Sequence, residues 1–236
     1  MPLILNIETT TGVCSVALSR NGELIGLKES DSKNSHSSEL AVFIDDILKT
    51  EGIDASSLDA VAVSEGPGSY TGLRIGVATA KGICYAKDLP MIGVNTLQAM
   101  SMGMHHAPVP APEGKYSTLL CPMIDARRME VYYAIFDENG KEIRETCAEI
   151  IDENSFMEYL AKNKVVFGGD GALKCRSLLD KHPNAIFLDN FQASAKYMVS
   201  LSEEKFKQKK FENLAYFEPF YLKDFVAGKP RVKGLR

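Results

Sequence analysis

A chain of 236 residues, 45% of them hydrophobic, is long enough to build one large domain or two small ones with buried cores. Its net charge of −4 excludes a protein that coats nucleic acid through bulk positive charge, although a local basic patch stays open. The five cysteines have no metal-ligand or CxxC spacing, and the chain shows neither a leader pattern nor an apolar run near the roughly 20 residues of a membrane span. We therefore expect reduced thiols in a cytoplasmic protein without a membrane contact.

The first part of the chain reads as a meander of strands followed by alternating helices and strands. Arg20-Asn21-Gly22 is typical of a hairpin turn. Polar residues 31–36 suit a helix N-terminus, and apolar residues recur at helical spacing from Leu40 until Gly52. The pattern predicts strands over 3–8, 13–19, 23–29, 59–64 and 91–94, with further helices over 70–85 and 96–104.

A proline-rich stretch, 105–114, interrupts the periodicity and predicts a linker or a long loop. The same order then recurs, with Glu138-Asn139-Gly140-Lys141 as a hairpin turn. A meander followed by alternation, twice in one chain, predicts an α/β protein with two related lobes over 1–104 and 105–190, and a returning helix and basic tail over 191–236. The expected strands are 117–124, 129–137, 143–150, 165–167 and 185–188, and the helices 153–162, 172–181 and 193–208.

The most unusual stretch is residues 66–76, GPGSYTGLRIG, between a predicted strand and a predicted helix. Free backbone N–H groups at such a helix start can receive an anion, whereas the plainer interpretation is a tight turn with close helix packing. Within the helix, Gly72, Gly76 and Ala80 recur four residues apart and form a ridge of small side chains. Each helical glycine costs about 1 kcal/mol relative to alanine, so the ridge predicts a closely packed neighbour, either in this chain or in a partner subunit.

Candidate chemical groups lie beside three turns. Glu8 begins a hydroxyl-rich loop with Thr9 and Thr10, while Asp125 and Asp170 adjoin turns in the second half. They do not make an assembled catalytic set. His36 heads a helix, but a metal-binding helix needs a second histidine four residues on, where Leu40 stands; the basic tail 223–236 fits a solvated end or a contact with RNA or an acidic partner.

Taken together, five segments of the chain resemble the TsaB (YeaZ) family. The resemblance covers nearly the whole chain in order and implies an actin-like (ASKHA) fold of two ribonuclease-H-like lobes, each a mixed sheet with helices. It rests on residues 5–10 (LNIETT), 14–18 (CSVAL), 66–76 (GPGSYTGLRIG), 125–127 (DAR) together with 130–132 (EVY), and 169–172 (GDGA).

The resemblance further implies a subunit of the bacterial machinery that forms threonylcarbamoyladenosine beside the anticodon of tRNAs reading codons that start with A. In that family TsaB is similar to the catalytic subunit TsaD without being the catalyst, pairs with TsaD as a heterodimer, and recruits the ATPase TsaE through that assembly. When TsaD is absent, we expect the same face of this chain to form a homodimer. ATP and metal are then expected on partner subunits, and tRNA contact only indirectly or weakly through the basic tail.

This chain departs from its catalytic relatives because His36 lacks its partner histidine. It departs from actin-like ATPases because branched residues, not glycines, follow Glu8. The loops at Glu8, Thr9, Thr10, Gly66, Gly68, Asp125 and Asp170 are therefore expected to be degenerate cofactor loops. The resemblance implies a partner interface on the first-lobe helices, at His36, Leu40, Tyr70, Gly72, Leu73, Gly76 and Ala80. The alternatives are a stand-alone actin-like ATPase or sugar-kinase-like enzyme and a metalloprotease-like enzyme.

Overall fold

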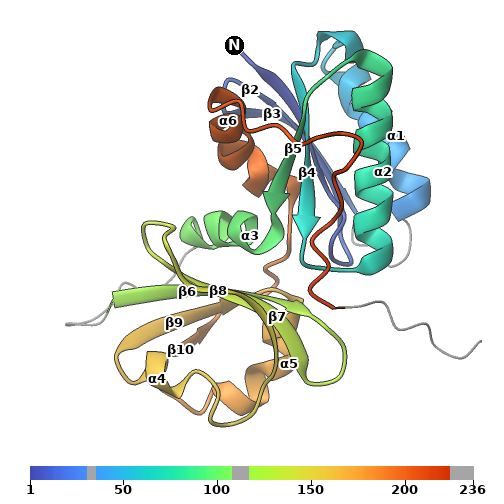
Figure 1. Ribbon diagram of the computed structural model, residues 1–236. Helices are drawn as coiled ribbons and strands as arrows, with labels where there is room; N and C mark the ends of the chain where they lie inside the picture. The colour runs from blue at the N-terminus through green and yellow to red at the C-terminus, as the bar shows by residue number, and fades with distance from the viewer. Residues whose placement is uncertain (31–35, 108–116, 224–236) are drawn as a thin grey trace, which may run out of the picture.

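The chain folds into two lobes, each built on a five-stranded sheet (Figure 1). The computed structural model describes residues 1–30, 36–107 and 117–223. The first lobe contains β1 (Leu3–Glu8), β2 (Cys14–Arg20), β3 (Glu23–Ser30), α1 (His36–Thr50), β4 (Ala60–Gly66), α2 (Tyr70–Lys87) and β5 (Met91–Asn95). The helix α3 (Thr96–His105) leads to the second lobe, which contains β6 (Ser117–Asp125), β7 (Glu130–Asp137), β8 (Glu142–Ile150), α4 (Met157–Leu160), β9 (Asn163–Gly168), α5 (Asp170–Leu179) and β10 (Ala185–Phe187).

The two sheets have the same topology. The order is β3-β2-β1-β4-β5 in the first and, read in the equivalent direction, β8-β7-β6-β9-β10 in the second. In both sheets the first strand of the lobe is antiparallel to the second and parallel to the fourth. The predicted doubling and the predicted fold class, two mixed sheets with helices, are confirmed.

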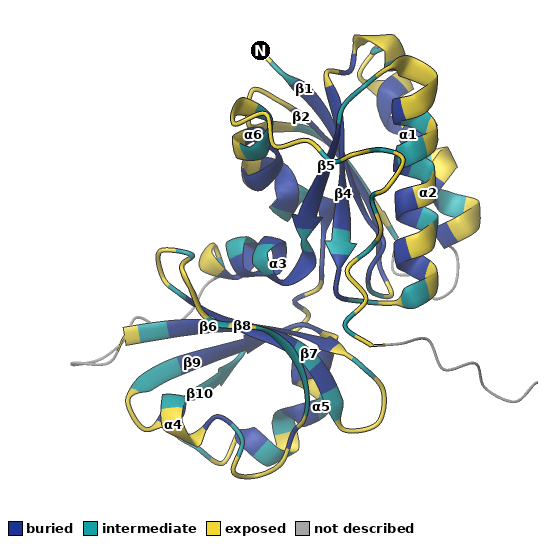
Figure 2. Cartoon of the chain, in the orientation of Figure 1, coloured by how far each residue is buried: buried dark blue, intermediate teal, exposed yellow. Residues whose placement is uncertain are grey.

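Helices cover both faces of the first sheet (Figure 2), which explains why β1 and β4 are apolar runs rather than alternating strands. On one face α1 and α2 contribute Leu40, Ile47 and Ala80 to a core with residues of β1, β2 and β4. On the other face the core includes Ala99 of α3 and Leu201 of α6 (Val199–Lys207).

The helix α3 lies between the two sheets. Ala99 packs in the core of the first lobe, whereas Leu97, Met100 and Met104 pack with β6, β7 and β9 of the second. The chain later returns to the first lobe through the 3-10 turn Ala195–Met198 and α6, which contact β1, β2 and β5. One continuous helix therefore belongs to both cores, and it fixes where the lobes meet.

Two predicted helices are shorter than expected. The helix predicted over 153–162 covers only Met157–Leu160, because Asp152 and Ser155 exchange hydrogen bonds in a local turn and Phe156 has a φ of 65°. The helix predicted over 193–208 is divided into the 3-10 turn and α6. The expected helix-capping residues 31–35, residues 108–114 of the predicted linker and residues 224–236 of the basic tail lie outside the described residues. None of the helices in the described ranges is long and apolar enough to cross a membrane.

Candidate functional site

A cleft of about 890 Å³ lies between the lobes, where the loops at the ends of the central strands converge. The first lobe contributes the β1–β2 loop, the head of α1 and the β4–α2 loop. The second contributes the β6–β7 turn and the start of α5, and the C-terminal segment adds residues 220–223. Among the residues predicted from sequence, those that line this cleft are Thr10, His36, Gly68, Tyr70, Gly72, Asp125 and Asp170.

The glycine-rich loop is packed against the β1–β2 loop. The Ser69 amide donates to the carbonyl oxygen of Thr10 over 2.7 Å, and the Gly72 amide donates to Oγ of Ser69 over 3.3 Å. A Cβ at Gly68 would lie 2.5 Å from Thr10, so no larger residue fits there. Two of the amide groups that an anion would need therefore already have partners inside the chain.

The ridge of small residues on α2 faces the core of its own lobe. A Cβ at Gly72 would lie 2.0 Å from the carbonyl oxygen of Thr9, and one at Gly76 would lie 2.4 Å from Oγ1 of the same threonine. Ala80 is fully buried in the first core. The close neighbour that the ridge predicted is therefore the β1–β2 loop of the same chain, not a second subunit.

Most of the expected interface is buried in the same way. Leu40 and Leu73 are each 1% exposed, and the Nε2 atom of His36 donates a 2.8 Å hydrogen bond to the Thr11 carbonyl oxygen. Only Tyr70, at the start of α2, is partly exposed. We correct the expected interface accordingly: six of its seven residues are buried within the lobe, whereas Tyr70 and the exposed positions of α1 and α2 stay open to a partner.

Glu8 is sealed beneath the cleft rather than exposed in it. Its Oε1 atom accepts a 2.6 Å hydrogen bond from the Thr10 amide and a second bond from the Thr10 hydroxyl. Burial raises the pKa of this carboxyl group above 4.5, and the bonds from Thr10 oppose that shift. Glu8 thus fixes the conformation of the β1–β2 loop, and its carboxyl group does not line the cleft.

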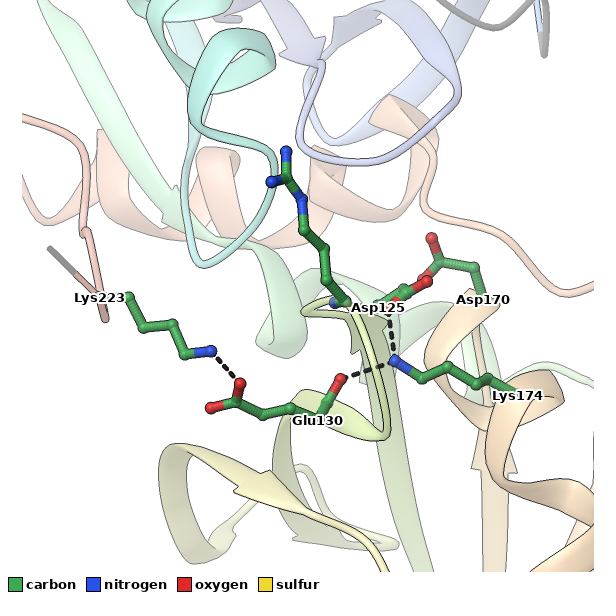
Figure 3. Close-up of polar contacts among 6 residues, drawn as sticks. Asp125, Glu130, Asp170, Lys174 and Lys223 are labelled. Atoms are coloured by element: carbon green, nitrogen blue, oxygen red, sulfur yellow. Dashed lines mark hydrogen bonds and ion pairs between the residues drawn. The ribbon is translucent and has the colours of Figure 1, made fainter. Parts of the chain in front are cut away.

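Asp125 and Asp170, the candidate aspartates of the second lobe, form one hydrogen-bonded group with a lysine (Figure 3). The Asp125 amide donates to Oδ1 of Asp170 over 3.0 Å, while the Asp125 carboxylate pairs with Nζ of Lys174. Lys174 also donates to the carbonyl oxygen of Glu130 over 2.7 Å. Burial raises the pKa of Asp170. These contacts fix the β6–β7 turn against α5, which is a structural use of both carboxylates.

The β6–β7 turn presents two arginines at the cleft in unusual conformations. Arg127 and Arg128 have φ values of 71° and 50°, a region that costs non-glycine residues of order 1 kcal/mol or more each. Both side chains are exposed, and Lys223 lies on the same side of the cleft beside Glu130. The two arginines therefore add positive charge to a part of the cleft in which Lys223 is already paired with Glu130.

Two features of the site were missed at the level of sequence. Lys174 follows Asp170 by four residues on α5, a spacing that puts both side chains on one helix face, and this signal was available. The contribution of residues 220–223 had no local signal, because their contacts are made with residues far away in the chain. Among the described residues, no group of three or more His, Cys, Asp or Glu side chains is placed to hold a metal ion.

Two lobes of equal topology, facing each other over a cleft at the ends of their central strands, define the actin-like class of folds. Two solved structures from Pseudomonas aeruginosa have this fold. The first, described as similar to peptidase YEAZ, has a TM-score of 0.79 and the second, YeaZ, one of 0.74; each is 21% identical, with 94% of this chain and all of the other covered.

The sequence comparisons define the family. The TsaD family, described as tRNA N6-adenosine threonylcarbamoyltransferase, matches residues 25–230. The tRNA threonylcarbamoyladenosine biosynthesis protein TsaB of Escherichia coli (strain K12) is 34% identical over 235 residues, or 96% of each chain. The chain belongs to the TsaB (YeaZ) family.

Proposed function

We propose that this protein takes part in the formation of threonylcarbamoyladenosine on tRNA in the cytoplasm, as a subunit that supports a catalytic TsaD partner without performing the chemistry. The first support is the near full-length similarity to proteins named for this pathway. On this proposal ATP and metal are bound by the partner subunits, and TsaE joins through the assembly with TsaD.

The non-catalytic role is supported by the contacts of the three candidate carboxylates, which all bind groups of this same chain. Glu8 is covered by Thr10, and Asp125 and Asp170 hold the β6–β7 turn with Lys174. A general base must reach the proton it removes. Each candidate acid is instead used to position the backbone, and the glycine-rich loop is closed by the Thr10 carbonyl group.

The outer face of α2 is our proposed surface for TsaD. Here a second set of small residues, Ala78 and Gly82, is exposed, and a Cβ at Gly82 would meet nothing within 4 Å. The neighbouring Tyr85 is 85% exposed. A pocket of about 790 Å³ with a mainly apolar lining lies between Gly82, Tyr85 and the turn at Asn213–Ala215.

This surface fits a helix of another subunit. A glycine in a helix interior costs about 1 kcal/mol, and nothing in the described part of this chain packs on Gly82 to offset that cost. Tyr85 lies beside an apolar pocket, and aromatic side chains in such pockets are the anchors that dominate the binding energy of interfaces. In the absence of TsaD, we propose that the same face pairs with a second copy of this chain.

Reconstitution tests the function. Purified TsaD, TsaE, tRNA and the remaining substrates of the modification are combined with and without this chain. We expect modified tRNA only in the full mixture, and none with this chain and ATP alone. Product formed at an equal rate without this chain would refute the supporting role, and ATP turnover by the chain alone would favour the stand-alone ATPase instead.

A pull-down with TsaD tests the surface. We expect Gly82→Arg to reduce capture at least tenfold, because a long side chain separates the two helices. Leu173→Arg is the matched control, since Leu173 is 47% exposed on α5 in the other lobe. Equal capture of both variants would place the interface elsewhere.

A further inference from the structure

The C-terminal segment 211–223 crosses from the outer edge of the first sheet to the second lobe. It begins beside β5, where the Glu212 amide donates to the carbonyl oxygen of Met91 over 2.9 Å, and it covers this edge strand. Leu214 and Phe217 pack against the first core. This half of the segment is attached firmly to one lobe.

The segment next crosses the glycine-rich loop. The Phe220 amide donates to the Glu65 carbonyl oxygen over 2.7 Å, and a Cβ at Gly66 would lie 2.7 Å from the Phe220 carbonyl oxygen. The rings of Tyr221 and Tyr70 are 5.0 Å apart. Gly66 is thus required where the segment approaches the end of β4, and Tyr221 connects the segment to the first turn of α2.

The end of the segment contacts the second lobe. Nζ of Lys223 pairs with the Glu130 carboxylate (Figure 3). The same atom lies 5.9 Å from the centre of the Tyr132 ring. Both partners belong to β7, whereas every contact of residues 212–221 described above is with the first lobe. Lys223 is therefore the point at which this segment joins the two lobes, along one side of the cleft.

We propose that residues 211–223 are a strap that closes one side of the cleft, and that Lys223 is its latch. With the latch engaged, the second lobe is held against the first by the strap as well as by α3. When Lys223 leaves Glu130 and Tyr132, the strap detaches from Tyr221 onward and the second lobe moves away from α2. The ion pair is partly exposed, with side-chain exposures of 38% and 24%, so this contact is weak enough to be reversible.

A tryptophan reporter tests the latch, because the chain contains no tryptophan. Tyr221→Trp keeps a ring against Tyr70, and its quenching by acrylamide measures release of the strap. We expect Lys223→Glu in this background to raise the quenching constant at least twofold. Lys210→Glu, an equal charge change at an exposed position of the α6–strap junction, should leave it unchanged, and the exchange of charges in Lys223→Glu with Glu130→Lys should restore the parent value.

Two measurements without the reporter complete the test. Hydrogen exchange at the Phe220 amide should become at least tenfold faster in Lys223→Glu, and the radius of gyration from small-angle X-ray scattering should increase relative to Lys210→Glu. Equal quenching and exchange in the two variants would overturn the latch. Faster exchange with an unchanged radius of gyration would show that Lys223 holds only the end of the segment, which overturns its role between the lobes.

Discussion

The hydroxyl group of Thr9 donates a 2.8 Å hydrogen bond to the carbonyl oxygen of Gly72. Through this bond the β1–β2 loop is seated directly on the first turns of α2, in the space that side chains at Gly72 and Gly76 would otherwise fill. Gly72 and Gly76 of the glycine-rich stretch 66–76 are thereby explained by packing within one lobe. These glycines allow two backbone segments to approach each other at the base of the cleft.

Substitution by alanine should have opposite effects on stability at two glycines of α2. Gly76→Ala should lower the free energy of unfolding by about 1–3 kcal/mol, because the new Cβ lies 2.4 Å from a threonine oxygen that is already hydrogen-bonded. Gly82→Ala should raise it by about 0.5–1 kcal/mol, since the position is open and alanine favours the helix. Urea unfolding of both variants measures the difference, and stabilisation by both would contradict the packing described for Thr9.

Glu8 should make the stability depend on pH. Its pKa in the folded state is raised by burial, so the native protein holds a proton that the unfolded chain releases near the ordinary value of 4.5. The contribution of Glu8 to stability is thus fully present below that value and is lost as the pH rises through the folded-state pKa. Glu8→Gln removes the titration. The free energy of unfolding of the variant should therefore increase relative to that of the parent protein as the pH rises. Denaturant curves at successive pH values measure this increase, and a difference independent of pH would argue against it.

Lys174 should matter more than an exposed lysine in a similar ion pair. Lys174→Met removes the contact with Asp125 and the bond to the Glu130 carbonyl oxygen, with an expected loss of about 2 kcal/mol. Lys181→Met breaks an ion pair with Glu153 in which both side chains are more than half exposed, and should cost under about 1 kcal/mol. Thermal unfolding compares the two variants, and losses of equal size would show that Lys174 does not hold the turn.

One thiol should react in the native protein. Cys14, Cys84, Cys121 and Cys175 are buried, whereas Cys147 is only half-buried. Burial raises the pKa of both Cys14 and Cys84 to about 11, which leaves little thiolate at neutral pH. A disulfide reagent at pH 8 should therefore modify one thiol rapidly and the other four only after denaturation. Rapid reaction of more than one, or of any thiol in Cys147→Ser, would show that the cores open.

The sequence was sufficient for the doubled architecture because its signals are local. Strand alternation, hairpin turns at Asn21-Gly22 and Asn139-Gly140, and helical spacing each depend on neighbouring residues, and the same order of elements occurs twice. It was insufficient for the length of α4, because the side chains of Asp152 and Ser155 compete there with the backbone for hydrogen bonds.

The candidate site divides in the same way. Residue types and spacing identified the loops that meet in the cleft, from Thr10 and Gly68 to Asp125 and Asp170. The sequence did not reveal which face of α2 is buried, because small residues occur on both faces of that helix. One face carries Gly72, Gly76 and Ala80, and the other carries Ala78 and Gly82. Only the packing of α2 on β4 and on Thr9 decides which set is buried.

The sequence by itself determined the family, the two lobes and the position of the cleft-forming loops, since these follow from local pattern and from similarity along the chain. The tertiary structure decided what the cleft residues do. Lys174 and Lys223 acquire their roles through contacts with residues 44 to 93 positions away in the chain. No local pattern encodes such contacts, because they exist only once two sheets, α3 and the C-terminal segment have been brought together.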